Sequence, residues 1–162
     1  GVASARGKKI CFIDSDLAYS LNHIHEMLKK LDKFDFVIGR RGLVTGNVEH
    51  IKPARKLTGL VFNRLARFIL GLDTEDTQAG LKGFRAEVAR ALFKRQRIAR
   101  FAFDVELIYL AKKLNYSMGE IPARLSEEHS DKHSKVNILQ DSIRMFLSLI
   151  AIRINNALGR YR

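Results

Sequence analysis

Apolar and polar positions follow two repeats along this chain, one typical of strands and one of helices. Short apolar runs bounded by charge or glycine predict strands at Lys9–Ile13 and Phe34–Ile38. Two further short strands are expected at Leu81–Phe84 and at Ser117–Ile121, the latter closed by Pro122. Apolar residues three and four positions apart predict helices at Leu21–Leu31, Pro53–Leu70, Ala86–Phe93, Phe101–Leu114 and Asn137–Leu158. Strands that alternate with helices favour an α/β fold whose sheet is mainly parallel and flanked by helices.

The helix predicted over Pro53–Leu70 begins at a proline, which is favoured at the first helical position, and ends before Gly71. Its large apolar residues recur at helical spacing, so we expect them to face the core. They are Leu57, Leu60, Val61, Leu65, Phe68 and Ile69.

The C-terminal predicted helix is amphipathic and basic. Its apolar face consists of Ile138, Leu139, Ile143, Met145, Phe146, Leu149, Ile150, Ile152 and Ile154. Arginines flank this face at 144, 153, 160 and 162. Such a helix suits a membrane interface, and packing on the core or on a partner is the alternative. We expect the interface, because the apolar arc is wider than a small domain needs.

Composition and charge narrow the function classes. The 162 residues, 46% hydrophobic and 28% charged, suit one ordered domain. A net charge of +12 points to a negatively charged partner, such as nucleic acid, an anionic membrane or a phosphorylated substrate, although solubility alone is the simpler interpretation. The single cysteine, Cys11, excludes an internal disulfide and a cysteine-based zinc site.

Two aspartates follow the first predicted strand, where Ile10–Leu17 reads I-C-F-I-D-S-D-L. Alternate side chains of a strand share a face, so Asp14 and Asp16 point the same way if the strand continues. Two carboxylates there suit a divalent cation, Mg²⁺ or Mn²⁺, that holds a diphosphate. An Asx turn after the strand is the alternative.

The polar stretch 71–83 carries a second group of candidate side chains, which Lys82 and Arg85 follow. Its members are Asp73, Glu75, Asp76, Thr77 and Gln78. A carboxylate beside glycines and a lysine suits a general base that faces a phosphorylated substrate. A solvated acidic loop is the alternative.

Further candidates lie on both sides of this stretch. Arg40, Arg41 and Arg55 follow the second strand, and guanidinium groups bind phosphate bidentately. Of Asp104 and Glu106 in F-D-V-E-L, one should face the sheet and the other the cleft, and we take Glu106 as the substrate-binding residue. The alternative is a helix cap and an acid that stabilises the helix dipole.

Five segments occur in an order that resembles the family 2 glycosyltransferases. They read A-R-G-K-K-I-C-F-I-D-S-D-L-A-Y-S, F-D-F-V-I-G-R-R, D-T-Q-A-G-L-K-G-F-R, F-D-V-E-L-I-Y-L-A-K-K-L-N-Y and G-E-I-P-A-R-L. The third is the most specific, since it is close to the D-T-Q-C-G-F-K pattern of the polyprenyl-phosphate (dolichyl-phosphate) glucosyl- and mannosyltransferase branch. The resemblance covers nearly all of the chain.

This resemblance implies a GT-A fold, the fold of nucleotide-diphospho-sugar transferases. It implies an inverting transfer of a hexose, glucose favoured, from UDP-glucose or GDP-mannose to a polyprenyl or dolichyl phosphate. The enzyme would be associated with the cytoplasmic face of a membrane and would use Mg²⁺ or Mn²⁺.

The resemblance also implies roles for single residues. Asp14 and Asp16 match the D-x-D that holds metal and donor diphosphate, and Asp76 matches the aspartate proposed as the base toward the acceptor. Asp16 and Asp76 are therefore the expected catalytic residues. The other positions that match substrate contacts are Arg41, Arg55, Gln78, Lys82, Ser134 and Lys135.

The family has a further N-terminal portion with a base-binding pocket, so we expect this chain to be truncated there and to bind nucleotide weakly alone. We divide it into residues 1–136, the C-terminal portion of a GT-A catalytic domain, and 137–162, an amphipathic juxtamembrane helix. A non-catalytic membrane-docking or interaction fragment is the alternative. A nucleic-acid-binding domain is disfavoured, because the sequence has no aromatic and basic binding motif.

Overall fold

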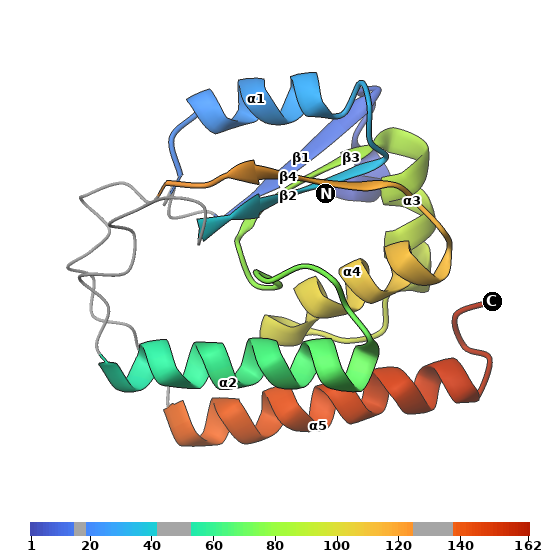
Figure 1. The fold of residues 1–162 in the computed structure, drawn as a ribbon. Coiled ribbons are helices and arrows are strands. Elements are labelled where there is room, and N and C mark those ends of the chain that lie inside the picture. The colour runs from blue at the N-terminus through green and yellow to red at the C-terminus, as the bar shows by residue number, and fades with distance from the viewer. Residues whose placement is uncertain (15–18, 42–52, 125–137) are drawn as a thin grey trace.

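The computed structural model describes residues 1–14, 19–41, 53–124 and 138–162 (Figure 1). The strands are β1 (Lys9–Ile13), β2 (Phe36–Arg40), β3 (Leu81–Arg85) and β4 (Met118–Pro122). The helices are α1 (Asn22–Lys30), α2 (Pro53–Leu70), α3 (Ala86–Arg95), α4 (Phe103–Lys113) and α5 (Ile138–Ala157). Each predicted strand and helix is therefore confirmed, with small shifts at its ends.

The four strands form one mixed sheet in the order β1-β3-β2-β4. Strand β3 is antiparallel to both of its neighbours, whereas β2 and β4 are parallel. The prediction of a mainly parallel sheet was therefore wrong. After α2 the chain returns through residues 71–80 and enters the sheet at the edge where β1 ends, so that Leu81 pairs with Ile13. The residues of so short a strand carry no signal for its direction, and the connection decides it.

Helices cover both faces of this sheet (Figure 1). Helix α1 lies on one face, where Met27 and Leu31 pack with Val37 and Leu81. Helices α3 and α4 lie on the other face, and α2 and α5 form a further layer beyond α4. The sheet is thus covered on both sides, which explains the continuous apolar runs I-C-F-I in β1 and F-V-I in β2.

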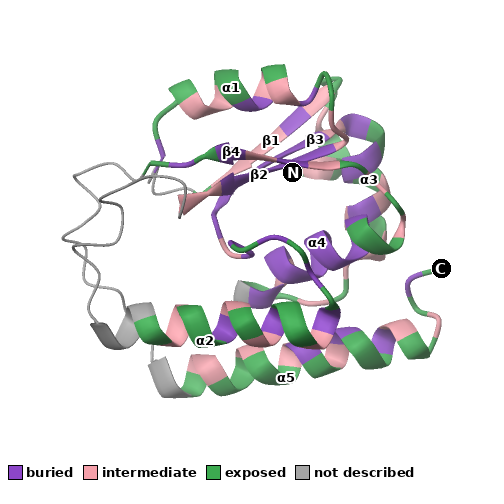
Figure 2. Cartoon of the chain, viewed as in Figure 1, coloured by how far each residue is buried: buried purple, intermediate pink, exposed green. Residues whose placement is uncertain are grey.

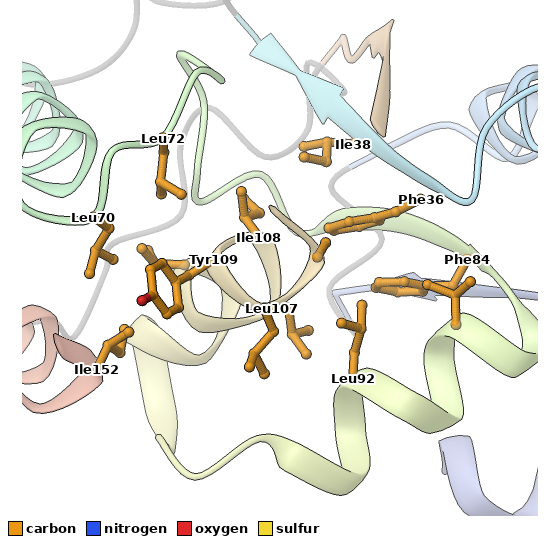
Figure 3. Packing of buried hydrophobic residues seen from close by; sticks show 14 of the residues in the cluster. Phe36, Ile38, Leu70, Leu72, Phe84, Leu92, Leu107, Ile108, Tyr109 and Ile152 are labelled. Carbon is orange, nitrogen blue, oxygen red and sulfur yellow. The ribbon is translucent and has the colours of Figure 1, made fainter. Parts of the chain in front are cut away.

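The larger core cluster lies between the sheet and the helices α2 to α5. Phe36 and Phe84, on adjacent strands, stack with ring centroids 4.5 Å apart, and Leu92 and Leu107 approach them from α3 and α4 (Figure 3). Ile152 of α5 joins the same cluster, so the C-terminal helix is packed on the domain core along one side.

The structure corrects the predicted orientation of α2 for four of its six residues. Its buried residues are Phe62, Ala66 and Leu70, with Leu65 and Ile69 partly buried. Four of the residues expected inside are exposed instead: Leu57, Leu60, Val61 and Phe68. Both sides of this helix carry apolar residues, so spacing alone does not identify the side that meets the core.

Candidate active site

The candidate residues gather where β1 and β2 end and β3 begins. Asp14 follows β1 directly, and its backbone N–H donates to the Gly80 carbonyl at 3.0 Å. The Asp14 carboxylate lies against Gly80, because a Cβ placed on that glycine would stand 1.7 Å from Asp14 Oδ2. Only glycine fits there without displacing the carboxylate. The first aspartate of the D-S-D segment therefore contacts the loop that carries the D-T-Q motif.

Arg41 and Asp76 form the central ion pair of this cluster. The carboxylate of Asp76 accepts hydrogen bonds from the Arg41 backbone N–H at 3.0 Å, from Nε at 2.9 Å and from Nη2 at 2.8 Å. Burial alone would raise the pKa of Asp76, but the hydrogen bonds and charge of Arg41 outweigh burial and lower it. Asp76 is thus an ionised group that fixes a guanidinium at the sheet edge.

Neighbouring contacts hold the loop in place around this pair. Arg40 forms ion pairs with Glu75 in the loop and with Glu120 on β4, whose Oε2 lies 3.0 Å from Nη1. Glu120 also accepts a hydrogen bond from Thr74 at 2.7 Å. The side-chain oxygen of Asn63, on α2, accepts a hydrogen bond from the Thr77 hydroxyl at 2.6 Å. The loop is therefore tied both to the sheet and to α2.

A second ion pair lies deeper. Lys82 is fully buried, and its Nζ donates to the Ala79 carbonyl at 2.5 Å and lies 2.8 Å from Asp104 Oδ1. Burial lowers the pKa of Lys82 and raises that of Asp104, while the attraction between the two groups opposes both shifts. Asp104 stands in the first turn of α4, so this pair joins α4 to the strand that follows the loop.

Tyr19 completes the cluster, and the sequence did not single it out. It is buried, and burial raises the pKa of its hydroxyl to about 12. Arg41 lowers this pKa, whereas Asp76 and Asp14 raise it, so all three lie within electrostatic reach. The signal available in the sequence was its position three residues after the D-S-D segment.

Glu106 lies away from this cluster, contrary to the expectation that it faces the cleft. It is fully buried and accepts hydrogen bonds from the backbone N–H groups of Arg97 and Ile98 at 2.8 to 3.0 Å and from the Tyr161 hydroxyl at 2.5 Å. Side chains two positions apart on a helix point in directions about 200° apart. Asp104 and Glu106 therefore point in nearly opposite directions, and Asp104 is the one that meets the site.

Several expected site residues lie outside the described part of the structure. Asp16, Ser134 and Lys135 belong to undescribed segments, and the side chain of Arg55 is undescribed as well. Gln78 is present in the loop, and its backbone N–H donates to Asp76 at 3.3 Å. The structure therefore brings together Asp14, Arg41, Asp76 and Lys82 from the predicted set, and adds Tyr19 and Asp104.

The carboxylate of Asp14 suits a hard divalent cation, since carboxylate oxygens are the ligands that Mg²⁺ and Mn²⁺ prefer. The described residues hold no group of three or more histidine, cysteine, aspartate or glutamate side chains that fits a metal ion. A cation bound by Asp14 would need further ligands, for which Asp16, water and a substrate diphosphate are candidates. This is the arrangement in which a magnesium ion is held by few protein ligands and by substrate phosphates.

Comparison with known proteins agrees with this geometry. A dolichyl-phosphate beta-glucosyltransferase of Dictyostelium discoideum is 29% identical over all of this chain and 51% of its own length. One from Trichomonas vaginalis is 30% identical over 95% of the chain and 47% of its own length, and one from Homo sapiens is 28% identical over 100% and 52%. The chain spans about half the length of these relatives.

The sequence was also compared with models of whole protein families. The model of the family described as "Glycosyl transferase family 2" matches residues 1–93, which include β1, β2, β3 and the D-T-Q loop. Because that match covers more than half of its residues, this chain belongs to glycosyl transferase family 2.

Proposed function

We propose that this chain is part of an inverting glycosyltransferase of GT-A fold. It transfers a hexose, glucose favoured, from a nucleotide-diphosphate sugar to a polyprenyl or dolichyl phosphate. The names of the similar proteins support the acceptor and the sugar. UDP-glucose is the favoured donor and GDP-mannose the alternative.

The convergence of Asp14, Arg41 and Asp76 at one edge of the sheet carries this proposal. Ligands of open α/β sheets bind outside the carboxyl ends of strands, and β1 and β2 both end here. The transfer brings a diphosphate and a phosphate monoester to the same place. A cluster of carboxylates for a cation, with a fixed guanidinium beside them, neutralises that negative charge.

The reaction itself is a single displacement. An oxygen of the acceptor phosphate attacks the anomeric carbon of the sugar, and the bond from that carbon to the donor diphosphate breaks. Asp14 and Asp16 would hold the cation, which would neutralise the leaving diphosphate when bound. Arg41, held in one orientation by Asp76, offers hydrogen bonds to a phosphate oxygen.

The role of Asp76 as a base toward the acceptor stays a prediction. An acceptor phosphate is already anionic and needs no proton removed before it attacks. The lowered pKa of Asp76 also makes it a weak base. Its three hydrogen bonds from Arg41 favour a positioning role instead.

A lipid phosphate resides in a bilayer, so we place the enzyme at a membrane surface and, following the family, on its cytoplasmic face. Among the described residues, no helix is long and apolar enough to span a membrane.

The proposal is tested by titrating the chain with UDP-glucose and GDP-mannose in a calorimeter, with and without Mn²⁺. We expect weak binding of one donor that requires Mn²⁺ and is lost in Asp16→Ala and Asp14→Ala. Asp73→Ala, which removes an exposed carboxylate of the same loop, is the matched control and should bind like the wild type. Binding that ignores Mn²⁺, or that survives in Asp16→Ala, contradicts the proposal.

A further inference from the structure

Exposed large apolar side chains collect on two helices. On α2 they are Leu57, Leu60, Val61 and Phe68, and on α5 they are Ile143, Phe146, Leu147, Ile150 and Ile154. Leu158 continues the series just after α5, and Leu21 is the only other one among the residues that the structure describes. Phe68 is 87% exposed, which is unusual for a phenylalanine of a globular domain.

These side chains form one stripe on each helix, with successive members three, four or seven positions apart, apart from the adjacent pairs. The opposite sides of both helices enter the same core cluster, through Phe62 and Ala66 on α2 and through Leu149 and Ile152 on α5. The two helices also contact each other and lie side by side in the outer layer (Figure 2). Both stripes therefore face away from the core, and we call them together the α2–α5 surface.

The charge of the same helices is almost entirely positive. Exposed arginines stand at 64 and 67 on α2 and at 144 and 153 on α5. Asp141 is the one acidic residue among their described side chains, and it is mostly buried, with Oδ1 3.9 Å from Arg144. An apolar surface with arginines beside it complements an anionic lipid bilayer, where apolar groups enter the interface and guanidinium groups meet lipid phosphates.

We propose that the α2–α5 surface docks on an anionic bilayer, with α2 contributing as directly as α5. The choice of a bilayer as the occupant rests on the proposed function. A second copy of the chain is a poorer occupant, because symmetric pairing would bring the arginines of both copies together.

Helix α2 also connects this surface to the candidate active site. The loop with Asp76 begins where α2 ends, and Leu72 N–H donates to the carbonyl of Arg67 at 3.1 Å. Asn63, on α2, accepts the hydrogen bond from Thr77 in that loop. Docking through α2 would therefore hold the Asp76 loop close to the membrane surface, where a lipid phosphate is presented.

The experiment is co-sedimentation of the 162-residue chain with vesicles of phosphatidylcholine and phosphatidylglycerol. We expect binding that weakens with added salt and with vesicles of phosphatidylcholine alone. Phe68→Asp on α2 and Leu147→Asp on α5 should each weaken binding at least about tenfold, because each removes a large apolar group from the interface and adds a negative charge. Leu21→Asp, on the opposite face of the sheet, is the matched control.

Unchanged binding of Phe68→Asp overturns the inference for α2, and no binding by the wild type overturns it as a whole. A wild-type dimer in sedimentation velocity that becomes a monomer in Phe68→Asp would assign the surface to a second copy instead. Circular dichroism melts of the variants check folding, since substitution of exposed side chains should leave the melting temperature unchanged. Calorimetric titration of Phe68→Asp with the donor and Mn²⁺ tests the proposed function separately. This variant should bind the donor as the wild type does, even though its binding to vesicles is weakened.

Discussion

The two ion pairs of the candidate active site differ in depth and in chemistry. Arg41 and Asp76 meet at the edge of the sheet, where the arginine side chain is 34% exposed. Lys82 and Asp104 meet beneath the loop, with the lysine fully buried. The arginine pair is bidentate and rigid, whereas the lysine offers one rotatable ammonium group.

The difference in depth distinguishes an arginine suited to contact a ligand from a lysine that supports the loop. The Arg41 guanidinium is accessible, and its orientation is fixed in advance, which suits a group that contacts a phosphate. Lys82 has no exposed surface and supports the loop through the Ala79 carbonyl, while its contact with substrate stays a prediction. The two pairs should therefore respond differently to mutation and to pH.

The largest effect is expected from breaking the deep pair. Asp104→Ala leaves the Lys82 ammonium, which has no exposed surface, without its ion-pair partner. Loss of one partner of a buried pair costs about 3–5 kcal/mol in the free energy of unfolding. Urea denaturation measures this cost, and Asp104→Asn, which keeps an oxygen acceptor, should lose less. A cost near zero for Asp104→Ala would show that the pair does not stabilise the fold.

Breaking the outer pair should cost less stability. Asp76→Ala frees an arginine that can turn toward water, so we expect a loss of about 1–3 kcal/mol, below that of Asp104→Ala. Donor or phosphate binding should fall more strongly than stability does, because Arg41 loses its orientation. Urea denaturation and calorimetry on the same preparation separate the two effects. If Asp76→Ala and Asp104→Ala lost the same free energy of unfolding, the difference in burial between the two ion pairs would have no effect on stability.

The pH dependence of stability should differ in sign between the two carboxyl groups. The lowered pKa of Asp76 stabilises the fold above its unfolded pKa of about 4, and this contribution is lost as pH falls. The raised pKa of Asp104 has the opposite effect, with a contribution that is present below about pH 4 and is lost as pH rises through the folded value.

Free energies of unfolding measured from about pH 2.5 to 8 test this contrast. Asp76→Asn should remove a rising slope on the acid side, and Asp104→Asn should remove a falling slope above about pH 4. Parallel pH profiles for the two variants would contradict the assigned environments.

The smallest effect is expected at the outer rim. Asp73 is highly exposed and pairs with Lys112 at 2.8 Å. Exposed pairs contribute less than about 1 kcal/mol, because water screens them and both side chains lose freedom. Asp73→Ala should therefore melt and bind donor like the wild type. A large loss in this variant would mean that the whole loop, and not only its buried carboxylates, depends on ion pairs.

Short-range patterns were enough to place the helices and strands. Helix α2 has the predicted bounds, and β1 begins and ends where expected, because periodicity and boundary residues act over a few neighbouring positions. Motif matching likewise selected Asp14, Arg41, Asp76 and Lys82, which the structure then brings together. The side chains at Asp16, Arg55, Ser134 and Lys135 remain predictions.

Which side of each element meets the core was decided only in three dimensions. The sequence alone did not reveal that β3 runs antiparallel between β1 and β2, that Phe68 faces outward, or that Asp104 rather than Glu106 meets Lys82. Each of these depends on contacts between residues far apart in the chain. Apolar residues occur on both sides of α2 and acids on both sides of α4, so only the packing of the whole domain determines which side is buried.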